Sequence, residues 1–222
     1  MSKLSQYIKF NKFINSFKIL FLMAFSFAFI ISLNNLEVFL IKFFNIKGNA
    51  WFNSFDEKVF LWINNNNSSL EFLMLTITYM GSITSWFAIA VFLWFLKRRK
   101  EAFILAFTLL IGGVLTFFMK IGFHRDRPFQ VLAEARVLDR GEDFSFPSGH
   151  SVSSFSSTTI LGRKNKKATI PLYIFSSLVA YSRIYVGVHW PSDVIFSGLI
   201  GVTIGFSILK LERKILNLLN KH

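Results

Sequence analysis

The feature that most constrains the fold of this chain is a series of apolar runs, several of them close to 20 residues long. A helix of about 20 apolar residues is long enough to cross the hydrocarbon core of a bilayer. The sequence is 53% hydrophobic and contains 29 Phe, more than a water-soluble domain of 222 residues has use for. Six segments can be marked, over residues 19–41, 70–96, 102–119, 150–161, 168–187 and 192–210. We therefore expect an all-α integral membrane protein with six transmembrane helices, in which residues 1–222 form a single membrane-embedded domain.

Three of these segments depart from a plain membrane span. Segment 19–41 follows a basic lead and shows no small-x-small cleavage site, so we interpret it as an uncleaved anchor. Segment 70–96 is long enough to span with tilt, and Gly81-Ser82 predicts a kink in it. Segment 150–161 is the least apolar because of its many serines, and we expect it to span only where other helices shield it and it forms one wall of a polar site.

The distribution of charge predicts how the helices are oriented, because lysine and arginine collect at the cytoplasmic ends of membrane helices. Four groups of four cations flank alternate ends of the segments, whereas every acidic residue except Glu101 and Glu212 falls on the other side. We expect a multi-pass protein of the cell membrane with both termini in the cytoplasm and the loops after the first, third and fifth segments outside. The cations are Lys3, Lys9, Lys12 and Lys18, then Lys97, Arg98, Arg99 and Lys100, then Arg163, Lys164, Lys166 and Lys167, and finally Lys210, Arg213, Lys214 and Lys221.

The composition also excludes several classes of function. The net charge of +13 does not indicate a nucleic-acid partner, because the basic residues cluster at the ends of apolar runs and form no single face. The chain has no cysteine, which excludes a disulfide framework, a thiolate nucleophile and a cysteine-based metal site. The bilayer is the partner that the composition does indicate, and protein partners stay unknown.

The most specific short motif is Pro147-Ser148-Gly149-His150, at the start of an apolar segment. Ser148 is a good helix N-cap, and Gly149 lets an anion approach the backbone closely. The free N–H groups and the dipole of a helix start form a ready anion site. The alternative is an ordinary capped helix with a surface histidine.

A second stretch, residues 182–193, pairs a cation with a histidine and a carboxylate. Arg183 offers a planar fork to phosphate oxygens. Gly187 and Trp190-Pro191 predict that one helix ends and another begins here, which places Asp193 in a first turn within reach of His189. A carboxylate on one imidazole nitrogen leaves the other nitrogen free as a nucleophile. The alternative is a favourable first-turn acid beside an interfacial histidine.

A third stretch, residues 120–128, carries Lys120 and Arg127 at the exit of an apolar segment. Such a cluster is usually an interfacial anchor. This one lies on the expected outer side, against the positive-inside bias, so we expect the two cations to have a function. His124 and Arg125 share the loop and rank below them.

Together the three stretches resemble the three-part signature of the type 2 phosphatidic acid phosphatase (PAP2) superfamily. The matching positions are Lys120-x6-Arg127-Pro128, Pro147-Ser148-Gly149-His150 and Ser182-Arg183-x5-His189-x3-Asp193. The signature covers residues 120–193, and the six apolar segments extend the similarity over nearly the whole chain, so the resemblance implies a PAP2-like helical bundle.

The resemblance also implies a metal-independent lipid phosphatase that works through a phosphohistidine and needs no cofactor. By this resemblance His189 is the nucleophile, Asp193 orients it, and His150 is the general acid for the leaving group. Three cations and a helix start can stabilise a phosphoryl group without Mg²⁺, and the signature contains no carboxylate cluster suited to a metal. The residues expected to hold the phosphate are Lys120, Arg127, Ser148, Gly149 and Arg183.

Several substrates and functions stay open at this point. Outward-facing microbial members of the superfamily act on undecaprenyl diphosphate, phosphatidylglycerol phosphate, phosphatidic acid or lipid A phosphates, and we favour undecaprenyl diphosphate, with a phospholipid monoester second. A non-catalytic lipid-phosphate binder or transporter is a further alternative. The histidines and Asp193 argue against it, because binding alone needs no nucleophile–carboxylate pair. A vanadate haloperoxidase, which has a similar anion cage, does not suit six lipid-compatible segments. The outer loops offer less: Trp51 to Ile63 suggests a membrane-surface helix, and the mixed charges of 129–146 suggest a solvated loop.

Overall fold

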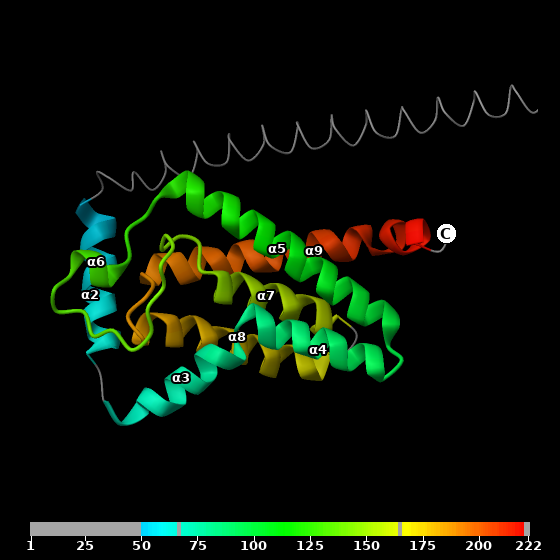
Figure 1. Cartoon of the computed structure of the whole chain (residues 1–222), viewed down its shortest axis with the longest axis horizontal. Helices are drawn as coiled ribbons and strands as arrows, with labels where there is room; N and C mark the ends of the chain where they lie inside the picture. The colour runs from blue at the N-terminus through cyan, green and yellow to red at the C-terminus, as the bar shows by residue number, and fades with distance from the viewer. Residues whose placement is uncertain (1–49, 66–67, 164–165, 220–222) are drawn as a thin grey trace, which may run out of the picture. The chain divides into compact units, whose positions relative to one another are not determined.

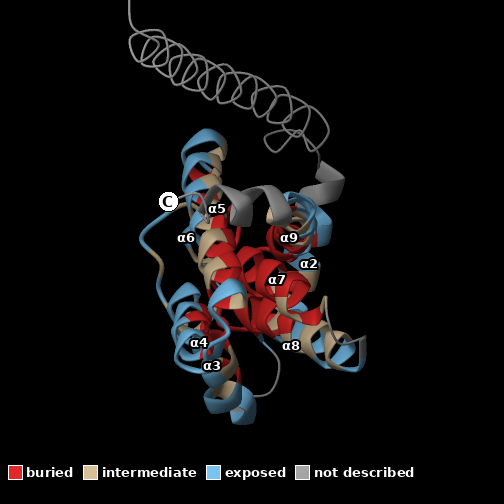
Figure 2. Ribbon diagram, turned by 90° about the vertical axis from the view of Figure 1, so that its right-hand side faces the viewer, coloured by how far each residue is buried: buried red, intermediate tan, exposed pale blue. Residues whose placement is uncertain are grey.

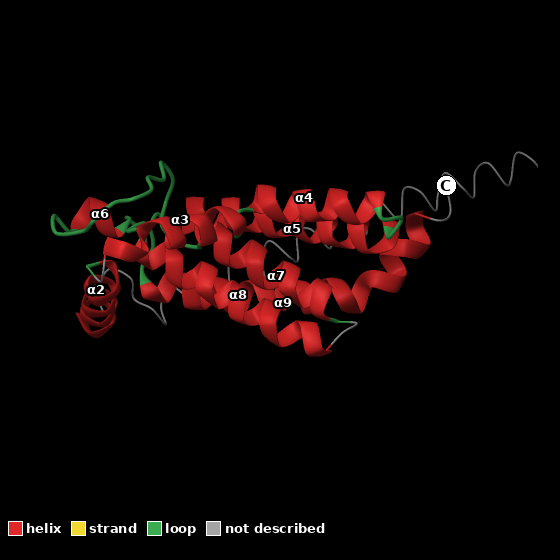
Figure 3. Cartoon of the chain, turned by 90° about the horizontal axis from the view of Figure 1, so that it is seen from below, coloured by secondary structure: helices red, strands yellow, loops and turns green. Residues whose placement is uncertain are grey.

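Every regular element in the part of the chain that the structure describes is a helix (Figure 3). A computed structural model describes residues 50–65, 68–163 and 166–219. The predicted first segment, 19–41, lies outside these residues. The elements are α2 (Ala50–Asn64), the 3-10 helix η1 (Ser68–Leu70), α3 (Glu71–Met80), α4 (Ile83–Phe95), α5 (Arg99–Phe123), α6 (Pro128–Val131), α7 (Gly149–Gly162), α8 (Lys166–Tyr185) and α9 (Pro191–Leu219).

The kink predicted at Gly81-Ser82 is confirmed, because α3 and α4 are two helices that meet at an angle of 52°. Ser82 caps the second of them by accepting a hydrogen bond of 3.2 Å from the Ser85 amide. Gly81 is needed at this corner because a Cβ atom there would collide with the Val179 side chain of α8. The absence of a side chain at Gly81 therefore lets the corner between α3 and α4 lie against α8.

Two stretches of helix are long and apolar enough to cross a membrane: Arg99–Val131, with 33 residues, and Pro191–Glu212, with 22. The bent pair α3–α4 gives a third if it counts as one span. An all-helical membrane protein is therefore what the described residues form. The expected number of six spans stays a prediction.

Helix α7 lies at the centre of the bundle and is buried on most of its surface (Figure 2). Most of its serine and threonine hydroxyls are paired inside the protein: Ser154 accepts a hydrogen bond of 3.0 Å from the Trp86 indole, and Thr158 shares one of 2.7 Å with Ser176. This confirms that the serine-rich segment is shielded by other helices. Pairing is favoured because an unsatisfied hydroxyl costs roughly 2–7 kcal/mol in an apolar surrounding. The buried Ser157 hydroxyl is the exception and has no hydrogen-bond partner in the part of the chain that the structure describes.

The long loops between helices gather at one end of the bundle, where α2 and α6 also lie (Figure 1). The turn between α4 and α5 lies at the other end. Helix α2 is more than the expected membrane-surface helix, because one of its faces is buried. Asn64 on that face donates hydrogen bonds of 2.8 Å to the carbonyls of Tyr185 and Arg136, and so joins α2 to the end of α8 and to the loop.

Candidate active site

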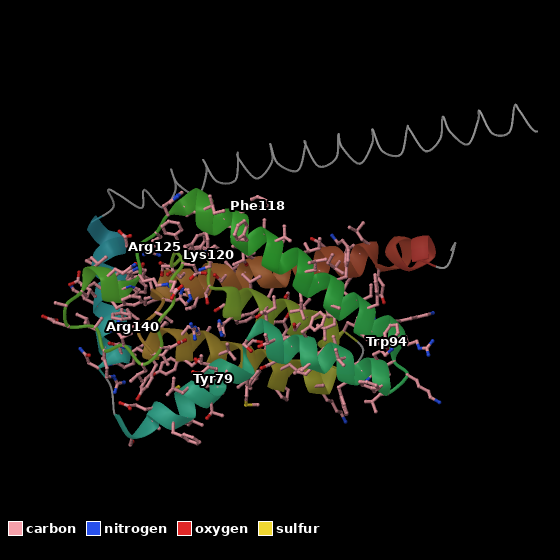
Figure 4. All side chains as sticks on the ribbon, viewed as in Figure 1. Tyr79, Trp94, Phe118, Lys120, Arg125 and Arg140 are labelled. Atoms are coloured by element: carbon pink, nitrogen blue, oxygen red, sulfur yellow. The ribbon has the colours of Figure 1, made fainter. Side chains whose placement is uncertain are left out.

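The signature residues come together at the end of the bundle where the loops gather. Lys120 lies near the end of α5, Arg127 directly precedes α6, and Arg183 lies in the last turn of α8. Figure 4 shows Lys120 and Arg125 at this end and Trp94 at the opposite one. The side chains are withdrawn from solvent although they are charged or polar; the buried members are Lys120, Arg127, Ser148, Arg183, His189 and Asp193.

The start of α7 is built as its sequence predicts. Ser148 is the N-cap, in extended conformation, and its hydroxyl accepts a long hydrogen bond of 3.5 Å from the Ser151 amide. The Ser148 amide donates to the Ser197 hydroxyl of α9 at 2.7 Å, which fixes the cap against the neighbouring helix. Gly149 then begins the helix, so its first N–H groups and the positive end of its dipole mark an anion-binding position.

His189 lies in the short connection between α8 and α9, and Asp193 lies in the first turn of α9, as predicted. The Nδ1 atom of His189 is 3.7 Å from Oδ2 of Asp193, which is an ion-pair distance and too long for a hydrogen bond. This nitrogen has no hydrogen-bond partner among the described residues. Oδ2 instead accepts hydrogen bonds from the Ser145 hydroxyl at 2.5 Å and from the Trp190 amide at 3.0 Å.

The electrostatic surroundings keep His189 neutral. Burial, together with the nearby charges of Arg127 and Arg183, lowers the pKa of His189 to about 3 although Asp193 acts in the opposite direction. A neutral imidazole has a lone pair for attack on phosphorus. His150, in the first turn of α7, is half-buried and interacts electrostatically with Arg183, His189 and Arg127.

The three signature cations are each paired with a carboxylate from the loop between α6 and α7. Asp143 bridges Lys120, at 3.1 Å, and Arg127, while Asp139 accepts from Arg183 at 2.9 Å. Although burial opposes it, the charges of Lys120 and Arg127 hold the pKa of Asp143 below its ordinary value. Both acids remain within reach of water, since the side chains of Asp143 and Asp139 are 59% and 27% exposed.

Sequence reasoning missed these loop acids, because a loop of mixed charge normally faces solvent. It also missed Asp56 and Ser145, which the fold brings to Arg125 and Asp193 from distant parts of the chain. Arg125, ranked below Lys120 and Arg127, is instead tightly held. The one local signal available for Asp56 was its position four residues before Phe60, which places a carboxylate on the same helix face as an apolar side chain.

Comparison with known proteins gives a consistent result. The family model of the PAP2 superfamily matches residues 101–216. An undecaprenyl-diphosphatase of Sulfolobus acidocaldarius is 35% identical over 162 residues, which cover 71% of this chain and 79% of the relative. The undecaprenyl-diphosphatase BcrC of Bacillus subtilis is 29% identical over 147 residues, which cover 65% and 76%.

A solved structure shares the fold. The crystal structure of a PAP2 type phosphatidylglycerolphosphate phosphatase from Bacillus subtilis superposes with a TM-score of 0.69, at 24% identity. The match covers 83% of this chain and 96% of the other. At this identity the similarity concerns the arrangement of the helices.

Proposed function

This chain belongs to the PAP2 superfamily of phosphatases, and we propose that it hydrolyses undecaprenyl diphosphate, a polyprenyl lipid, at the outer face of the cell membrane. The observation that carries the proposal is the convergence of Lys120, Arg127 and Arg183 with two histidines and the start of α7 in one cluster, most of whose members are buried. The relatives named undecaprenyl-diphosphatase support the choice of lipid.

In the proposed reaction, Nε2 of His189 attacks the terminal phosphorus while Nδ1 faces Asp193. The bond between phosphorus and the bridging oxygen breaks, and His150 gives a proton to that oxygen, so that undecaprenyl phosphate leaves. Water then attacks the phosphohistidine, His150 takes its proton, and inorganic phosphate is released. The cations and the amides at the start of α7, including that of Gly149, stabilise the charge on the equatorial oxygens, without a metal ion.

The substrate phosphate must replace the loop carboxylates on these cations. Asp143 and Asp139 occupy the positions that phosphate oxygens would take, and both lie on a loop that reaches solvent. A phosphate group offers more acceptor oxygens and more charge than one carboxylate, and Arg183 still has an unpartnered Nε to donate. Exchange of the loop acids for phosphate is therefore the first step of binding.

The proposed topology has six transmembrane helices in a single domain of residues 1–222, with both termini in the cytoplasm. The turn at Lys97, between α4 and α5, lies at the end of the bundle away from the cluster, in agreement with a basic cytoplasmic side (Figure 1). The cluster then lies at the outer leaflet, where a lipid headgroup can reach it.

The pH dependence of the reaction follows from the state of His189. Because its pKa lies below the ordinary 6.5, His189 is a free nucleophile well into the acid range. The acidic limb of kcat/KM, which reports the free enzyme, is therefore expected below pH 6.5. The profile of kcat, which reports the enzyme–substrate complex, is expected to be bell-shaped and to close on the alkaline side where the complex loses the proton that His150 gives to the leaving group. Titration of the lipid phosphate, followed by ³¹P NMR, is the control. A rate that rises steadily from pH 4 to 9 contradicts this assignment.

The substrate is tested with purified protein in detergent and EDTA, by measuring phosphate release from a panel of lipids. Undecaprenyl diphosphate is expected to give the highest kcat/KM, ahead of phosphatidylglycerophosphate and phosphatidic acid. A clear preference for the monoesters would support a phospholipid phosphomonoesterase instead. Absence of release from every lipid would support a non-catalytic lipid-phosphate binder or transporter.

A further inference from the structure

Arg125 is the one site cation whose acidic partners come from helices and not from the loop. Its side chain, 13% exposed, lies between the start of α9 and the middle of α2. Nη1 donates to Oδ1 of Asp193 at 2.5 Å and to the Ser192 hydroxyl at 2.7 Å. Nη2 donates to Oδ2 of Asp56 at 2.6 Å. Arg125 therefore bridges two carboxylates that are 69 and 68 positions away in the sequence.

Both partners of Arg125 are fixed in place. The side chains of Asp56 and Asp193 are 1% and 0% exposed, in contrast to the accessible loop acids on the other cations. Asp56 also accepts from the amide of Ser192, at 2.9 Å, and from its hydroxyl, at 2.5 Å, so it is anchored to the start of α9 as well. A phosphate can displace a loop carboxylate, but it cannot displace these two without moving α2 or α9.

From this geometry we propose that Arg125 and Asp56 form a positioning pair that orients the Asp193 carboxylate toward His189. The proposal rests on the proposed role of His189 as the nucleophile. Arg125 takes Oδ1, Ser145 and the Trp190 amide take Oδ2, and this fixes the plane of the carboxylate with Oδ2 on the side of His189. Arg125 is thereby separated from Lys120, Arg127 and Arg183, which face the phosphate.

Asp56 has the further task of balancing charge. Because Arg125 pairs with both Asp56 and Asp193, its positive charge neutralises each of the two carboxylates only in part. Asp193 therefore keeps enough negative charge to stabilise the cation that forms when His189 becomes phosphorylated. The other groups that act on His189 are Arg127 before α6, Arg183 on α8 and His150 on α7, and the test leaves them unchanged.

The pair predicts opposite effects of two single variants. In Arg125→Gln no cation offsets the charge of Asp193, so the His189 pKa rises and the acidic limb of kcat/KM is expected to move up by about one pH unit. In Asp56→Asn the Arg125 charge is no longer shared with a second carboxylate and offsets Asp193 more strongly. The His189 pKa then falls, and the acidic limb is expected to move down by a similar amount. Arg125→Gln is also expected to lower kcat by about 10- to 100-fold with KM little changed, the loss typical of a group that orients a reactive side chain.

Three further variants sharpen the test. The double variant, Arg125→Gln with Asp56→Asn, restores the balance of charge and is expected to return the acidic limb to the wild-type position. Arg125→Lys keeps the charge without the fork and is expected to leave the limb in place but to lower kcat. Arg140→Gln removes an exposed arginine from the nearby loop and should change neither kcat nor the limb (Figure 4).

The outcomes separate the inference from the proposed function. A rise in KM at unchanged kcat in Arg125→Gln would show that Arg125 is a substrate-binding cation. A lower kcat with no shift of the acidic limb in any variant would show that the pair has only a structural role. Either result overturns the inference. NMR titration of ¹³C-labelled histidine, assigned with a His189 variant, gives the same shifts without turnover. Shifts in the NMR titration alongside an inactive wild type would uphold the pair and refute the phosphatase.

Discussion

Replacement of His189 by alanine is expected to lower kcat on the order of 10⁴-fold or more, because it removes the atom that bonds to phosphorus. The side chain is buried, 2% exposed, between Asp193 and two arginines, so neither water nor another side chain can take its place without rearrangement. Substrate should still bind, since Lys120, Arg127 and Arg183 remain. Phosphate release and equilibrium binding of a lipid phosphate to the variant measure the two effects separately.

Trapping identifies the intermediate directly. Wild-type enzyme quenched by denaturation during turnover of labelled lipid is expected to carry acid-labile phosphate, and His189→Ala is expected to carry none. His124→Asn is a matched control, because His124 is exposed and asparagine tolerates its left-handed backbone, with φ of 46°. Equal labelling of the wild type and His189→Ala would refute the assignment of the nucleophile.

Arg183→Ala is the variant with the second largest expected effect. Arg183 is buried against Asp139, and its unpartnered Nε is available to a phosphate oxygen. Loss of one such preorganised donor costs on the order of 10²–10³-fold in kcat, because the developing charge is stabilised in a site from which water is excluded. KM is expected to rise as well, since the same arginine contacts the phosphate in the ground state.

Arg183→Lys separates charge from geometry. Lysine keeps the positive charge but lacks the planar fork, so it should recover part of the affinity and little of kcat. Arg140→Ala, on the exposed loop, is the control for loss of one positive charge at this end of the protein. Full activity of Arg183→Ala would show that the two remaining cations suffice and would remove Arg183 from the site.

Much of the fold could be predicted because its signals are local. The apolar segment 168–187 corresponds to α8, Lys166–Tyr185, and segment 192–210 begins one residue after α9 does. Ser148 as an N-cap and Pro191 as the first residue of α9 follow from capping and from the missing amide of proline. Each of these features depends on residues a few positions apart.

The supports of the site could not be predicted, because they depend on contacts between distant segments. In the sequence, Arg125 resembles an ordinary interfacial cation. Its ion pair with Asp56 forms only because the fold places α2 beside it. Asp139 and Asp143 sit in a loop of mixed charge, and nothing in the order of its residues indicates that they pair with the cations of the site. The signature therefore predicted the cations and histidines of the site, whereas the carboxylates that pair with its cations were found only in the fold.

The pairing of the loop acids with the site cations has a consequence for turnover. Four cations, Lys120, Arg125, Arg127 and Arg183, meet four carboxylates, Asp56, Asp139, Asp143 and Asp193, so the resting site is close to electroneutral. Substrate binding is then an anion exchange, and the displaced carboxylates remain tethered beside the site at high local concentration. The same tethered anions compete with the phosphate product after hydrolysis, so they weaken the retention of a small anion that has lost its lipid anchor.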